Sequence, residues 1–189
     1  GTRRVLGPLE QKLLIAAILS ERAQECGPQF YFHRFRDHQG IPARINEFIT
    51  SVRRIGIASP QELAEKLNTC AERRRHVSAE LVTVFERYLE RLENARAIDD
   101  TGIFLEIAQR AVAGQLDLRA HLASPELLVL EGYYELTLPE QQILNAFCAQ
   151  FDRSILTLDA PFNLYHFPAA TEIPRPFRIF QEMVRYLQA

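Results

Sequence analysis

The sequence lacks an apolar run long enough to cross a lipid bilayer. Its longest apolar stretches, residues 13–19 and 127–130, fall far short of the roughly 20 residues that a membrane-spanning helix needs. No basic and apolar signal segment stands at its start, which reads Gly1-Thr2-Arg3-Arg4, and we interpret that start as a boundary inside a longer protein. We therefore expect a soluble protein with no membrane partner.

Cysteine is scarce as well, and Cys26, Cys70 and Cys148 are the three in the chain. They are widely spaced, odd in number and include no C-x-x-C pair, which argues against a disulfide framework and against a zinc ribbon. This pattern is typical of a reducing compartment. We expect a cytoplasmic location and cysteines that fill the core.

The glycines exclude a phosphate-binding loop within this sequence. Such a loop needs Gly-Lys followed by Ser or Thr, because backbone amides wrap the phosphates while the lysine reaches the terminal pair. None of the eight glycines is followed by lysine. The spacing of His33 and His38 does not place both on one helical face as metal ligands, and no local signature of a nucleophile with its base is present. We expect no catalytic residues, no metal and no cofactor in this chain, which should neither bind nor hydrolyse nucleoside triphosphate.

Charge is unevenly distributed, although the net charge is only −2. Residues 1–97 hold 16 basic and 12 acidic side chains, whereas residues 98–189 hold 6 and 12. Local fields steer charged partners, so contact with DNA should come from the first half. The candidate DNA-binding residues are two arginine clusters, Arg53-Arg54 and Arg73-Arg74-Arg75. An ordinary solvated surface remains the alternative interpretation of both clusters.

The first two thirds of the chain read as helices. Apolar residues at helical spacing predict helices over residues 8–25, 43–55, 59–71, 78–95 and 100–114. Ser59-Pro60-Gln61-Glu62 forms a capping box, Ser78 can cap the fourth helix, and Asp99-Asp100 can cap the fifth. In the fourth helix one stripe should be buried and the other face solvated. The buried stripe is Leu81, Phe85, Tyr88, Leu89 and Leu92, and the solvated face is Glu86, Arg87, Glu90, Arg91 and Glu93.

Strands are predicted only in the last third. Leu127-Leu128-Val129-Leu130 is a short continuous apolar run, typical of a parallel strand buried on both faces. A capping box at Thr137-Leu138-Pro139-Glu140 starts a helix to about Gln150, and residues 154–159 form a second strand. This order predicts a βαβ unit with parallel strands, followed by an amphipathic helix that carries Phe177, Phe180, Met183, Val184 and Leu187. The expected fold class is mainly α with a small parallel β component.

The end of the first predicted strand resembles the metal-binding end of a nucleotide hydrolase. Glu131 follows the strand, where such enzymes place a magnesium-binding carboxylate ahead of an acid that orients the attacking water. The next residue here is Gly132, which has no side chain to act as a base. Glu131 and Gly132 therefore form a degenerate Walker B-like pair that does not support hydrolysis.

The stretch Leu130-Glu131-Gly132-Tyr133 with Glu135-Leu136-Thr137 resembles the degenerate second-acid motif in the B subunit of the bacterial AddAB (RexAB-like) helicase–nuclease, which belongs to superfamily 1. Upstream, residues 45–63 resemble the helical segment before that motif, and Phe85 to Glu90 with Asp99-Asp100 resemble a segment shared by such helicases. The resemblance covers residues 8–160. Glu131 stands where aspartate is usual in the family.

The resemblance implies a helicase 1B-like helical domain over residues 1–123 and, over 124–189, a βαβ remnant of a RecA-like motor core with a C-terminal helix. The phosphate loop of the family would precede residue 1, and its nuclease domain would follow residue 189. The implied role is DNA repair and recombination, as an inactivated ATPase region that guides DNA within a helicase–nuclease and contacts a partner subunit. DNA binding should be weak and salt-dependent. The alternative is a helical protein-interaction module without nucleic-acid binding.

Overall fold

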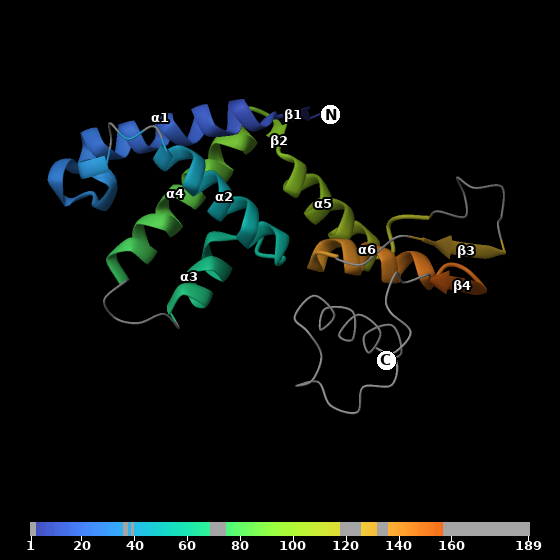
Figure 1. Ribbon diagram of the computed structural model, residues 1–189. Coiled ribbons are helices and arrows are strands. Elements are labelled where there is room, and N and C mark those ends of the chain that lie inside the picture. Colours follow the sequence, from blue (N-terminus) through green and yellow to red (C-terminus); the bar gives the residue numbers. More distant parts are fainter. Residues whose placement is uncertain are drawn as a thin grey trace. The chain divides into compact units, whose positions relative to one another are not determined.

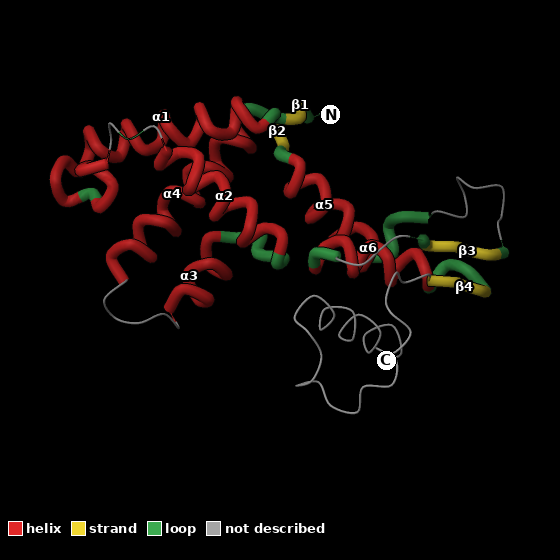
Figure 2. Tube along the Cα trace, viewed as in Figure 1, coloured by secondary structure: helices red, strands yellow, loops and turns green. Residues whose placement is uncertain are grey.

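The computed structural model describes residues 3–35, 38, 40–68, 75–117, 126–131 and 136–156 of the 189-residue chain. The described part is mainly helical and contains two small parallel sheets of two strands each (Figures 1 and 2). It divides into two compact units, residues 1–105 and 106–189. No helix in these described ranges has the length and apolar character to span a membrane. The predicted domains 1–123 and 124–189 stay predictions.

In its described residues, unit 1 contains four main helices, two short 3-10 helices, one sheet and the start of a fifth helix. In chain order these are β1 (Arg4–Val5), α1 (Pro8–Cys26), η1 (Gly27–Gln29), η2 (Tyr31–Phe35), α2 (Gly40–Arg54), α3 (Pro60–Asn68), α4 (Arg75–Asn94), β2 (Ala97–Ile98) and α5 (Asp100–Val112). Helix α1 packs on α2 and α4, and α3 packs on α4 (Figure 1). Their shared core includes the fully buried Ile15, Ile18, Phe30, Ile49, Leu63, Val84, Phe85 and Tyr88.

The five predicted helices are confirmed within the described residues, but α2 and α4 begin at Gly40 and Arg75, each three residues before the predicted start. The predicted last residues of the third helix, 69–71, lie outside the described residues. Gly56 ends α2 in the left-handed region at φ 89°, and Ser59 Oγ accepts the backbone N–H of Glu62 at 3.2 Å. The carboxylate of Glu62 reaches back one residue further than the predicted box, to the N–H of Ala58 at 2.8 Å. The predicted cap at Ser78 is wrong. Helix α4 already begins at Arg75, because residues 75–77 include no residue that breaks a helix.

Paired charges join α1 to α4 along their length. Arg91 Nη2 lies 2.5 Å from Glu21 Oε2, and Arg87 Nη2 lies 2.7 Å from Glu25 Oε2. The later residue of α1, Glu25, pairs with the earlier residue of α4, Arg87, so the two helices are antiparallel. On the predicted solvated face of α4, Glu86, Glu90 and Glu93 are exposed, and the side chains of Arg87 and Arg91 are 28% and 42% exposed while they pair with α1.

The sheet of unit 1 was not predicted. Strands β1 and β2 pair in parallel, with Arg4 opposite Ala97 and Val5 opposite Ile98. Each strand has two residues, too few for the alternation of apolar and polar positions that identifies a strand in a sequence. The pairing holds the entry to α1 beside the exit from α4.

A buried carboxylate connects three helices of unit 1. Asp99 is 2% exposed and caps α5, because its Oδ1 accepts the backbone N–H of Gly102 at 2.6 Å. Its Oδ2 accepts the hydroxyl of Tyr88 on α4 at 2.7 Å and lies 3.3 Å from Nη1 of Arg53 on α2. We call Arg53, Tyr88, Asp99 and Gly102 the Asp99 cluster. The predicted cap at Asp99 is confirmed.

Unit 2 contains the predicted βαβ unit. Strand β3 (Leu127–Leu130) pairs in parallel with β4 (Arg153–Leu156), and α6 (Leu138–Cys148) connects them. The box at the start of α6 is present, with the N–H of Thr137 donating to Glu140 Oε2 at 2.7 Å. The predicted positions 157–159 of the second strand, and the helix that carries Phe177, Phe180, Met183, Val184 and Leu187, lie outside the described residues.

Burial of β3 on both faces is not observed. Leu130 packs with Leu136 and Leu144, but Leu127 and Val129 are 43% and 53% exposed. Side chains of a strand alternate between faces, so one α6 helix covers only one of them. In the part of unit 2 that the structure describes, no element covers the other face. The prediction of a strand is confirmed, and the prediction of its two-sided burial is wrong.

Adding a methyl group at Gly102 should destabilise unit 1. A Cβ there would lie 2.6 Å from Arg53 Nη2 and 2.9 Å from Asp99 Oδ1, so the Asp99 cluster would have to shift. We expect Gly102→Ala to lower the free energy of unfolding by about 1–3 kcal/mol, the usual cost of overpacking. Urea denaturation followed by circular dichroism measures it. Gly40→Ala is the matched control, since nothing lies within 4 Å of a Cβ at that helical position, and an equal loss in both variants would contradict the packing argument.

Acid should remove the contribution that the ion pairs of Glu25 make to the stability of the folded protein. Hydrogen bonds from Arg87 first, and then from Arg22, lower the pKa of Glu25 below its ordinary 4.5. A depressed carboxyl pKa contributes stability that is present above the ordinary pKa and lost as the pH falls through the lowered one. We expect Glu25→Gln to melt below the parent protein at pH 7, with a difference in Tm that shrinks on acidification below pH 4.5. The exposed Glu86 supplies the control Glu86→Gln, and a pH-independent difference for Glu25→Gln would refute the assignment.

Candidate nucleic-acid interface

Arg54 is the predicted DNA-binding residue that the structure places on a surface. It is the last residue of α2, is exposed, and is followed by Ile55, which is 60% exposed. A cation in the last turn of a helix also suits the negative end of the helix dipole. Its guanidinium is therefore accessible to solvent and to a negatively charged partner.

Arg53, its neighbour, is not on the surface. It is 6% exposed, and its Nη1 lies at ion-pair distance from Asp99. Burial, followed by the negative charge of Asp99, raises the pKa of Tyr88 far above its ordinary value, so the Tyr88 hydroxyl stays protonated and donates a hydrogen bond to Asp99. The cluster thus holds one buried cation against one buried anion. Arg53 therefore belongs to the interior of unit 1 and is not part of the candidate interface.

The second arginine cluster is described only in part. Arg75 is the first residue of α4, but its side chain is not described, and Arg73 and Arg74 lie outside the described residues. The structure therefore does not report how these guanidinium groups lie relative to Arg54. They stay candidates on sequence grounds.

Glu131 lies where the sequence places it, directly after β3. It is exposed, and Leu130 of β3 is opposite Leu156 of β4, so the carboxyl ends of both parallel strands meet at one edge of the sheet. This is the edge at which ligands bind in open parallel sheets. Gly132 lies outside the described residues. Within the described ranges no three His, Cys, Asp or Glu side chains gather in a way that could hold a metal ion.

An aromatic segment after α1, which was not among the predicted DNA-binding residues, forms a second candidate surface. Phe30 is 1% exposed and anchors it in the core, while Tyr31, Phe32 and Phe35 of η2 are half-buried. Beside it lies a cavity of about 410 Å³. The density of aromatic and basic residues between positions 30 and 38 was the available signal, but the sequence does not separate a core cluster from a surface cluster.

No protein-family model matches the chain, and no curated protein is significantly similar to it.

Replacing each of the two neighbouring arginines should change the stability of the protein by very different amounts. Arg53→Met leaves Asp99 buried without its cation, so we expect a loss of about 3–5 kcal/mol in the free energy of unfolding. Arg54→Met removes an exposed charge and should change stability by no more than about 0.5 kcal/mol. Urea denaturation of the two variants measures the difference. Similar losses in both would show that Arg53 is not held as described.

Proposed function

We propose that this chain is a non-catalytic part of a helicase–nuclease subunit of the AddAB type that acts in the processing of DNA double-strand breaks. In this proposal it supplies scaffold and a surface that guides DNA, and a partner subunit of the same complex supplies the motor. The observation that carries the proposal is the parallel β3–α6–β4 unit with Glu131 directly after β3. An acid at the carboxyl end of a parallel strand is the arrangement of a RecA-like motor core.

The positions at which the chain enters and leaves the helices of unit 1 support the same proposal. A helical domain inserted into a motor core must leave and rejoin that core at neighbouring points. The parallel pairing of β1 with β2 brings Arg4 beside Ala97, with four main helices between them. The helical segment thus has the entry and exit that an insertion requires.

DNA contact in this proposal is electrostatic. Arg54 at the exposed end of α2, together with Arg73, Arg74 and Arg75, would meet phosphates and release counterions. Gly132, which follows Glu131, has no side chain to activate water, and none of the glycines in the sequence forms a phosphate loop, so binding without turnover is the expected behaviour.

A second candidate function is a protein-interaction module. Helix α1 exposes Leu9 and Leu13 by 69% and 61%, one helical turn apart, and Val5 of β1 is 50% exposed. Exposed apolar side chains grouped in this way mark protein contacts more often than DNA contacts. This function predicts no salt-dependent affinity for nucleic acid.

The salt dependence of DNA binding distinguishes the two functions. Fluorescence anisotropy with labelled duplex and single-stranded DNA, between about 50 and 200 mM salt, should show weak binding that falls steeply as salt rises. Arg54→Glu should lower the affinity and reduce the slope of log K against log salt by about one for each lost phosphate contact. The reason is that each phosphate contact releases its own counterions.

The matched control is Arg110→Glu, which makes the same charge change at an exposed position of α5 in the acidic half of the chain. We expect binding by this variant to stay near that of the parent protein. Equal losses in both variants would indicate a general charge effect and not a surface at Arg54. Absence of DNA binding at low salt would reject the proposal in favour of the protein-interaction module.

A further inference from the structure

The segment that follows α1 presents aromatic rings and a cation together on the surface of unit 1. Arg34 is exposed, and its guanidinium carbon lies 4.7 Å from the ring centre of Tyr31 and 4.8 Å from that of Phe35. These distances place one planar cation against two aromatic rings. Among the described residues no ion pair is recorded for Arg34, in contrast to Arg22, which pairs with Glu80 at 3.3 Å.

The rings are held in place from within the core. Phe30 is buried and meets Phe32 edge to face at 5.6 Å, and Phe32 meets Tyr31 edge to face at 5.1 Å. Phe35 continues the series, with its ring centre 6.0 Å from that of His38. A chain of ring contacts thus runs from a buried anchor to the exposed imidazole of His38. Such a series fixes the outer rings without burying them.

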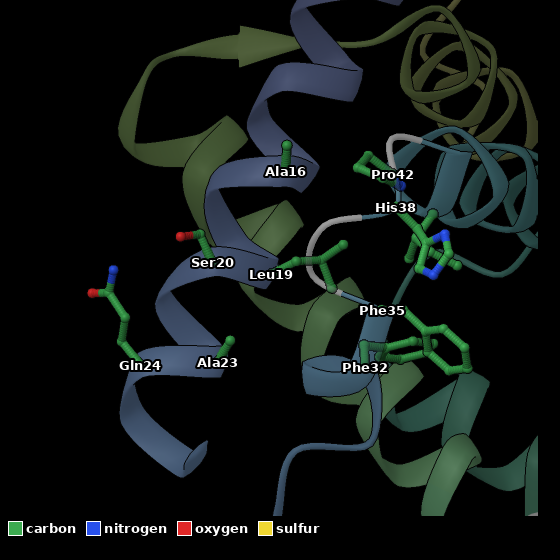
Figure 3. Close-up of a pocket in the computed structure, with 10 residues that line it drawn as sticks. Ala16, Leu19, Ser20, Ala23, Gln24, Phe32, Phe35, His38 and Pro42 are labelled. Carbon is green, nitrogen blue, oxygen red and sulfur yellow. The ribbon is translucent and has the colours of Figure 1, made fainter. Parts of the chain in front are cut away.

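Two hollows lie beside these rings. One, of about 410 Å³, is lined by Leu19 and Ala23 of α1 on one side and by Phe32, Phe35 and His38 on the other (Figure 3). Ser20 and Gln24 of α1 also border it, with side chains that point away from the rings (Figure 3). The other, of about 520 Å³, is lined by Tyr31 and Arg34 together with His33 and His76. Glu80 also lines this second hollow, but its charge is matched by Arg22.

We propose that Tyr31, Arg34, Phe35 and His38 form a binding site for single-stranded nucleic acid, in which unpaired bases stack on the rings and Arg34 contacts a phosphate. An apolar ligand would use the rings but leave the guanidinium without a counter-charge. A single strand uses both, because each nucleotide offers a flat base and a negative phosphate at close spacing. This site deepens the proposed function, on which it rests, by adding a platform specific for unpaired strands.

The absence of tryptophan makes the site directly observable. Phe35→Trp keeps an aromatic platform and introduces a single tryptophan, whose emission is quenched when a base stacks on it. The probe is an oligodeoxythymidylate of about 16 nucleotides, a length that spans common single-strand sites. With the full chain we expect saturable quenching that follows the binding curve from anisotropy. Phe104→Trp is the matched control, because Phe104 is 44% exposed on α5 and lies outside the site.

Loss of the platform should weaken binding. Phe35→Ala and Arg34→Gln should each lower affinity for the oligonucleotide by about tenfold, the effect expected for one stacked base, with a smaller effect on duplex DNA of the same length. Circular dichroism checks that the variants fold. Arg34→Lys keeps the charge but not the planar group, so its affinity should fall between that of Arg34→Gln and that of the parent protein.

Three results would overturn the site. If anisotropy shows binding while the tryptophan emission of the Phe35→Trp variant stays constant, the strand binds elsewhere and the proposed function is left standing. No binding of any nucleic acid would reject both. A shift of that tryptophan emission with protein concentration, in the absence of oligonucleotide, would show that the cavity is a contact between copies of the chain.

Discussion

The structure of unit 1 depends on the buried pair of Arg53 and Asp99. Asp99 caps α5, accepts the hydroxyl of Tyr88 from α4 and faces Arg53 from the more distant α2, so three helices meet at one carboxylate. The pair is not fully satisfied, because Arg53 Nε has no hydrogen-bond partner within the described residues. A buried ion pair of this kind contributes little net stability compared with an apolar substitute, but it strongly disfavours any arrangement that separates its members. Its effect is to specify one packing of the helices.

The sequence was sufficient for most helices because their boundaries rest on local chemistry. The capping box at Thr137, the cap at Asp99 and the glycine at position 56 act within a few residues, so each is visible in a short window. Parallel pairing of β3 with β4 was also predictable, since a strand, a helix and a strand of these lengths leave few other connections. The predicted RecA-like character of that unit stays a proposal.

What the sequence did not reveal depends on contacts between distant positions. Arg53 and Arg54 are indistinguishable as a dipeptide, and only the placement of Asp99 makes one internal and the other external. The ion pairs of Arg87 and Arg91 were not predicted, because their partners Glu25 and Glu21 belong to another helix. The same limit applies to the aromatic segment at residues 30–35, where sequence alone gave no means of separating the buried Phe30 from the half-buried Tyr31 and Phe35.

The pairing of β1 with β2 also constrains the order in which unit 1 forms. Arg4 and Ala97 are separated by nearly the whole sequence of unit 1, so bringing them together costs chain entropy. The few hydrogen bonds between the two strands offset only part of that cost. The contacts within α1, α3 and α4 and between neighbouring helices carry no comparable cost. We therefore expect the two short strands to join after the helices have packed, and their separation to open the unit at this seam while the helices remain packed. The seam is the part of unit 1 whose backbone amides should exchange first.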